Sequence, residues 1–146
     1  MAAAMSAIWL LSGIFLSTVF AAGSAASAAD QRAEPAIKGY DPVAYFRLAK
    51  AVKGSESFSL QWHDMTWQFS SMEHRELFAA EPERYAPQYD GYCAWAMTES
   101  RLAITDPEVW KIVDGKLYLN CSPAAYEKWS RDIPGHIRKA DAIWKE

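Results

Sequence analysis

The sequence predicts a small α+β domain with two β-hairpins and about four short helices, and three observations support that class. Residues 58–69 and 110–120 each hold apolar, strand-forming residues on both sides of a short polar turn, as β-hairpins do. Around them, Ser or Asp followed by Pro or by an apolar run indicates the start of short helices. The composition, 51% apolar and 23% charged, is that of a globular chain and excludes collagen-like or wholly disordered proteins.

The N-terminal segment differs from the rest because no charged side chain precedes Asp30. Residues 7–22 are mainly apolar, but the segment is short for a helix that crosses a bilayer, which needs about 20 residues. Residues 26–28 have the Ala-Ser-Ala form that signal peptidase cleaves. We predict a signal peptide at 1–28, a polar leader at 29–36 and a domain at 37–146. Residues 1–6 lack Lys and Arg, so an uncleaved N-terminal anchor is the alternative. In both cases the domain is exported, to the periplasm or the medium, and no stable membrane span is expected after cleavage.

Two helix-start signatures define the first half of the domain. Asp41 precedes Pro42, whose fixed φ suits the first turn of a helix that Asp41 can cap. Ser70 and Glu73 have the spacing of a capping box, in which each side chain bonds the other residue's backbone N–H. The expected elements are a helix at 42–50, strands at 58–62 and 66–69 joined by the turn 63–65, a helix that follows the capping box to 81, and a helical turn through 85.

The second half holds the clearest hairpin, because Asp114-Gly115 supplies the positive φ angles of a type I′ turn. Ser122-Pro123 again places a capping residue before a Pro that suits a helix start. The expected elements are strands at 110–113 and 116–120, a helix at 123–131, and a last helix from about 134 with Ile137, Ala140 and Trp144 on one face. We expect no internal repeat.

Charge and motifs exclude several classes of function. The chain has 15 basic and 18 acidic side chains, a formal net charge of −3, and lacks the clustered positive charge that binds nucleic acid or acidic lipid. It contains no G-x-S-x-G, H-E-x-x-H, phosphate-loop or dinucleotide-binding motif. Asp41 and Asp90 could form a carboxylate pair, but a helix cap and a turn account for them. We therefore expect a protein that is not an enzyme and has no nucleic-acid partner.

Four motifs in a fixed order connect the chain to a known family. They are Gly-Tyr-Asp-Pro-Val-Ala-Tyr-Phe at 39–46, the stretch 78–85 with its Pro82, Tyr-Asp-Gly-Tyr-Cys-Ala at 89–94, and Asp-Gly-Lys-Leu-Tyr-Leu-Asn at 114–120. On these motifs the chain resembles the exported YHS-domain proteins of bacteria, over nearly everything from 37 to 144. The resemblance implies the YHS fold. It implies little about activity, because these exported members are mostly without an assigned function.

The resemblance also implies a metal site that this chain has changed. YHS domains attached to metal-handling proteins carry one Cys in a D-P-V-C segment and two in an F-C-x-x-x-C segment, and thiolates suit soft metals. The corresponding positions here hold Ala44, Ser70 and His74. Only His74 is a strong metal ligand, so the resemblance implies that this site is lost or rebuilt. Tight zinc binding, which uses four Cys or His ligands, is not expected there.

Cys93 and Cys121 are the only cysteines, and the sequence leaves three roles open for them. In an oxidising compartment they can form a disulfide, whose loop of about 29 residues is worth roughly 3.5 kcal/mol in the chain-entropy model. Alternatively they are separate thiols, with Cys93 buried as a small apolar side chain. In the third case Cys93 takes part in ligand chemistry.

A weaker pattern predicts a metal site. Cys93 and Met97 are four residues apart, so a helix would place a thiolate and a thioether on one face, and this pair favours Cu(I). His63 and His74 could complete the set, so copper is expected before zinc if the cofactor is a metal. In the alternative interpretation Met97 fills the core and both His side chains are solvated, because no C-x-x-C or H-x-x-x-H spacing occurs.

Aromatic residues supply the other candidate site. Tyr40, Tyr89 and Tyr92 lie in Gly-flanked or turn-like motifs, so together with Asp41 and Cys93 they form the candidate lining of a small-ligand pocket. Alternatively, the large side chains only give a small domain a sufficient core. We expect an exported, non-enzymatic binding module for a metal ion, copper before zinc, or for a small ligand. The alternative is an accessory domain that contacts another exported or membrane protein.

Overall fold

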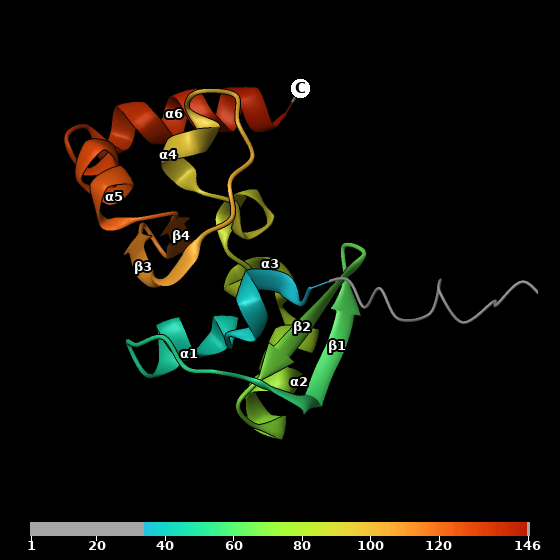
Figure 1. The fold of residues 1–146 in the computed structure, drawn as a ribbon. Coiled ribbons are helices and arrows are strands. Elements are labelled where there is room, and N and C mark those ends of the chain that lie inside the picture. The colour runs from blue at the N-terminus through green and yellow to red at the C-terminus, as the bar shows by residue number, and fades with distance from the viewer. Residues whose placement is uncertain (1–33, 146) are drawn as a thin grey trace, which may run out of the picture. The chain divides into compact units, whose positions relative to one another are not determined.

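Helices and two hairpins alternate along the chain in the computed structural model, which describes residues 34–145 (Figure 1). The helices are α1 (Pro42–Arg47), α2 (Met72–Ala80), α3 (Pro82–Tyr85), α4 (Ala94–Met97), α5 (Pro123–Ser130) and α6 (Ile133–Trp144), with short 3₁₀ segments η2 (Ala36–Gly39) and η3 (Gln88–Gly91). Strands β1 (Ser55–Trp62) and β2 (Met65–Phe69) form one antiparallel sheet, and β3 (Asp106–Val113) and β4 (Lys116–Asn120) form another. The predicted α+β class with two hairpins is confirmed.

Both hairpins turn through two residues with positive φ. Asp114 and Gly115 have φ of 51° and 75°, as the type I′ prediction requires. In the first hairpin His63 and Asp64 have φ of 50° and 57°, and Met65 already belongs to β2. The first turn is therefore one residue shorter than expected, because His63 and Asp64 adopt the left-handed conformation that Asp and Gly adopt in the second turn.

The two hairpins also share one pairing register, which shows that the fold repeats. Equivalent pairs differ by a constant offset in residue number, from Ser55–Phe69 and Asp106–Asn120 at the open end to Trp62–Met65 and Val113–Lys116 at the turn. A bulge interrupts each register directly after the open-end pair. We call residues 35–86 the first repeat and residues 87–144 the second repeat.

The loops that precede α1 and α4 repeat as well. In each, two residues in the left-handed region precede a Gly with positive φ, and a Tyr follows; the sets are Ile37, Lys38, Gly39 and Tyr89, Asp90, Gly91. The N–H of Asp41 donates to the carbonyl of Val52 (2.8 Å). At the equivalent place in the second repeat, the N–H of Cys93 donates to the carbonyl of Ala103 (3.0 Å). The expectation of no internal repeat is therefore wrong. The backbone conformation repeats although most side chains differ.

The second hairpin lies between two apolar cores. On one face, Leu117 and Leu119 belong to the core that the first repeat builds around Trp67 and Phe78. On the other face, Tyr118 packs in a second core, with its ring 5.4 Å from that of Trp129. Because both faces are covered, the side chains of β4 from Leu117 to Asn120 are all buried.

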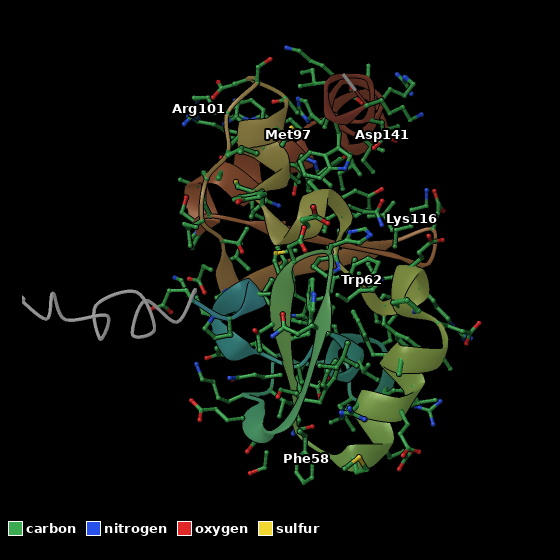
Figure 2. The ribbon with its side chains drawn as sticks, turned by 90° about the vertical axis from the view of Figure 1, so that its right-hand side faces the viewer. Phe58, Trp62, Met97, Arg101, Lys116 and Asp141 are labelled. Carbon is green, nitrogen blue, oxygen red and sulfur yellow. The ribbon has the colours of Figure 1, made fainter. Side chains whose placement is uncertain are left out.

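The first hairpin has one apolar face and one polar face. The positions equivalent to Trp110, Ile112, Leu117 and Leu119 are Ser59, Gln61, Thr66 and Gln68. The Gln61 amide donates to the Thr66 hydroxyl at 2.5 Å, so two of these polar side chains bond each other across the strands. Arrays of repeats need such a polar outer face at their ends. Figure 2 shows Phe58 and Trp62 far apart along this hairpin.

The capping-box prediction is wrong by one residue. Ser71, not Ser70, is the N-cap of α2, and its hydroxyl accepts the N–H of His74 (3.1 Å). Ser122 caps α5 in the same way, accepting from Ala125 at 3.1 Å. The Ser70 side chain bonds Asp41 instead, so that it joins the end of β2 to the start of α1.

The predicted signal peptide, 1–28, lies outside the described residues, as does most of the leader, 29–36. The fold begins slightly earlier than the expected residue 37, because Ala36 is already buried in the first core. Within residues 34–145, no helix has the length and apolar character needed to cross a membrane.

Candidate functional site

A cavity of about 310 Å³ opens where η2 and η3 meet. Its lining combines η2 and the residues before it, the end of η3, the start of β2 and the loop before β3. The lining residues are Glu34, Pro35, Ala36, Ile37, Lys38, Met65, Asp90, Gly91, Tyr92, Ile104 and Thr105. The surface of the cavity is mainly apolar, although half of the lining side chains carry a polar group, and such a surface is usual for a small-molecule site.

Strained backbone forms the wall between the two loops. Ile37 has φ 46° and ψ 42°, a left-handed conformation that a β-branched residue rarely adopts. Gly91 has φ 85°, and a Cβ built on it would lie 2.6 Å from Cγ2 of Ile37. Only a glycine therefore permits this approach of η3 to η2. Strained residues of this kind often cluster at ligand sites, where the surrounding structure holds them in place.

Three polar contacts hold the loops around the cavity. The Thr105 hydroxyl donates to the carbonyl of Gly91 (2.8 Å), and the Lys53 ammonium donates to the carbonyl of Lys38 (2.5 Å). Asp90 Oδ1 lies 3.3 Å from Nδ1 of His63, whose ring stacks on that of Trp62. These contacts fix the cavity wall before any ligand arrives.

The structure does not bring the five predicted pocket residues together. Tyr92 lines the cavity, but Cys93 is fully buried and contacts the other cysteine. The Tyr89 hydroxyl donates to Asp141 (2.9 Å), and burial together with this carboxylate raises the Tyr89 pKa. Tyr40 packs against the first core with the Lys53 ammonium 5.0 Å from its ring centre. Tyr40 and Tyr92, which follow Gly39 and Gly91, occupy equivalent positions in the two repeats. They therefore lie beside different cores.

Asp41, the remaining member of that set, is completely buried and joins three elements. Its Oδ1 accepts the N–H groups of Val43 (2.9 Å) and Ala44 (3.3 Å) at the start of α1. Its Oδ2 accepts from the N–H of Ser70 (2.9 Å), from the Ser70 hydroxyl (2.6 Å) and from Nδ1 of His74 (2.6 Å). The carboxylate thus satisfies five donors, which makes it a structural cap for α1, β2 and α2.

These three residues have the composition of a hydrolytic triad but not its geometry. In a triad, the Asp and the Ser bond opposite nitrogens of the imidazole. Here Ser70 Oγ and Asp41 Oδ2 both lie on the Nδ1 side of His74, at 3.4 Å and 2.6 Å. Since Nδ1 must donate to the carboxylate, it has no lone pair with which to take the Ser70 proton. The cluster therefore does not activate a nucleophile.

The four candidate metal ligands lie in four different surroundings. His74 bonds Asp41, His63 contacts Asp90 and stacks on Trp62, and Cys93 contacts the other cysteine; the side chain of Met97 belongs to the second core. Figure 2 shows Met97 far from Trp62, the neighbour of His63. The described residues contain no group of three or more His, Cys, Asp or Glu side chains that could hold a metal ion.

Cys93 and Cys121 are both free thiols, and their sulfur atoms are 3.0 Å apart. Burial raises the pKa of Cys93 to about 11. The N–H of Cys121 donates to Sγ of Cys93 at 3.1 Å. The sequence left open whether the two residues meet, and in the structure they are in contact.

Sequence reasoning missed most of the cavity. Ile37, Lys38, Ile104 and Thr105 belong to no chemical motif, and they come together only because η2 packs on η3. The recurrence of Pro-x-x-x-Gly-Tyr at 35–40 and 87–92 is the signal that could have found them. Comparison with known proteins adds nothing further: no family model, no curated protein and no solved structure matches this chain.

Proposed function

We propose that the protein is an exported, non-enzymatic binding module of the YHS type, and that its ligand is a small, mainly apolar organic molecule with a cationic end. The observation that carries this proposal is the cavity between η2 and η3, because its volume of about 310 Å³ lies within the range of small-molecule sites.

The charges around the cavity favour a cation. Two carboxylates, Glu34 and Asp90, and one ammonium group, Lys38, line it, so the lining itself has one more negative than positive group. The Lys53 ammonium, which bonds the carbonyl of Lys38, is not among the lining groups. The ring of Tyr92 and the aliphatic side chains of Ile37 and Ile104 supply the apolar surface. A ligand with an apolar body and an ammonium group matches both features.

Two further observations support an organic ligand ahead of a metal ion. The walls are held by polar contacts and by strained residues, so the site is preorganised and little ordering cost accompanies binding. The candidate metal ligands His63, His74 and Met97, in contrast, are each engaged in separate contacts.

Binding can be tested with three probes that share a phenyl group and differ in charge: 2-phenylethylamine, 2-phenylethanol and 3-phenylpropionate. In ¹H–¹⁵N spectra of the whole chain, we expect saturable shifts at the amides of Ile37, Gly91 and Thr105. The amine should bind tightest and the carboxylate weakest. No saturable shift with any probe, or the reverse order of affinity, would contradict the proposal.

The loop before β3 offers a matched pair of variants. Ile104 and Leu102 are both largely exposed, at 68% and 63%, but only Ile104 lines the cavity. Ile104→Ala should weaken the amine about fivefold, because it removes apolar contact worth about 1 kcal/mol. Leu102→Ala should leave the affinity unchanged. Equal effects of the two variants would place the binding site elsewhere.

A further inference from the structure

The sulfur pair occupies the position that the Asp41 cluster holds in the first repeat. Asp41 precedes α1 as Cys93 precedes α4, and each residue accepts the N–H of the residue that follows the hairpin, Ser70 or Cys121. The side chains of Ser70 and Cys121 then face Asp41 and Cys93 at 2.6 Å and 3.0 Å. Both repeats thus join a helix start to a strand end at the same place.

The second repeat makes this junction with fewer hydrogen bonds. Asn120 Oδ1 accepts the N–H of Trp95 (3.1 Å), a role that Asp41 has for Val43 in the first repeat. The Asn120 amide nitrogen is buried and has no hydrogen-bond partner among the described residues. Cys93 contacts Asn120 only at 3.8 Å. Where the first repeat has five hydrogen bonds to the Asp41 carboxylate, the second repeat has the Asn120 bond and a pair of thiols, which a covalent bond would join more tightly.

The two thiols differ in access. Cys93 is fully buried, whereas Cys121 is partly exposed. From these observations we propose that Cys93 and Cys121 form a reversible disulfide by exchange with an external disulfide, in which Cys121 reacts first and Cys93 resolves the intermediate. The sulfur atoms need to approach by only about 1 Å to reach bonding distance, ~2.0 Å.

The exchange balances in two steps. The thiolate of Cys121 attacks one sulfur of the external disulfide, which forms a mixed disulfide and releases the other sulfur as a thiolate. The thiolate of Cys93 then attacks Sγ of Cys121, which forms the internal disulfide and releases the second external sulfur. The two protons lost by the cysteines end on the two external thiolates, so the protein is oxidised by two electrons and the external disulfide is reduced by two. Burial raises the pKa of Cys93 and so lowers its thiolate fraction, which makes Cys93 the poorer of the two thiols for the first attack.

Oxidised glutathione is a suitable probe for this reaction on the reduced whole chain. Intact-mass measurements should show the wild type losing two hydrogen atoms, with a glutathione adduct only as a transient species. Cys93→Ser should accumulate one stable adduct at Cys121. Cys121→Ser, whose new side chain matches Ser70 of the first repeat, should react at least about tenfold more slowly, because Cys93 is buried. Dithiothreitol should return the folded wild type to the dithiol.

Three results would overturn the proposal. They are a stable glutathione adduct on the wild type, equal rates for the two single variants, and resistance of the folded disulfide to dithiothreitol. Cys93→Ala provides the same test as Cys93→Ser with a small apolar side chain in the buried position. Probe binding in the cavity is measured separately, so failure of this proposal leaves the ligand proposal standing.

Discussion

Replacing Asp41 with Ala should destabilise the domain more than the loss of an ordinary helix cap. The substitution removes the N-cap of α1, which costs about 1 kcal/mol in other proteins. It also leaves the Ser70 N–H and Nδ1 of His74 without an acceptor in a buried site, at about 1–3 kcal/mol for each unsatisfied group. We expect a total loss of about 3–7 kcal/mol, a large part of the 5–15 kcal/mol by which a native domain is typically stable.

Asp132→Ala is the matched control for this experiment. Asp132 caps α6 by accepting the N–H of Gly135 at 3.0 Å, but this cap is exposed and has no second group of donors. Its loss should cost about 1 kcal/mol. Urea unfolding followed by Trp fluorescence gives both values, and the m-value should be the same in the two variants. If Asp41→Ala cost no more than Asp132→Ala, the idea that Asp41 joins three elements would be refuted.

Three other predictions follow from the repeat, the cavity and the thiol pair. Gly91→Ala should destabilise the protein by about 1 kcal/mol more than Gly115→Ala. Both glycines have positive φ, but only a methyl group at Gly91 would meet a neighbouring loop. Thermal unfolding of the two variants measures the difference. Leu119→Gln should lower the free energy of unfolding in urea by about 3–5 kcal/mol, because it buries an amide in the first core. Gln68→Leu, at the equivalent position on the polar face of the first hairpin, should change it by less than about 0.5 kcal/mol. In the reduced protein, the pKa of Cys93 rises from 9.0 in the unfolded chain to about 11 in the folded one, so its contribution to stability is full below pH 9 and is lost as pH rises towards 11. Urea unfolding across this pH range should therefore show a steeper decline in stability for the reduced protein than for the oxidised protein.

Local signals in the sequence predict the elements well. Asp41-Pro42 starts α1 and Asp114-Gly115 forms the second turn, because these residues determine backbone conformation through their own side chains. The capping box failed because Ser70 and Ser71 are both competent caps. The choice between them depends on Asp41, which is distant in sequence and takes the hydroxyl of Ser70.

The repeat and the cavity depend on contacts that the sequence does not display. Equivalent strand positions carry opposite polarity, such as Thr66 and Leu117, because Leu117 packs in the first core and Thr66 does not. The cavity brings together segments far apart in the chain, and its Ile37 adopts a conformation against its own preference. Neither fact follows from local propensity.

Native mass spectrometry with metal analysis of the protein, purified without denaturation from its source cells, tests the central claim most directly. Our account predicts a bound organic molecule that carries a basic group, without stoichiometric copper or zinc, and predicts that Ile104→Ala loses this molecule while Leu102→Ala keeps it. Stoichiometric metal in its place, or an organic adduct that both variants retain equally, would contradict the assignment of the cavity as the ligand site.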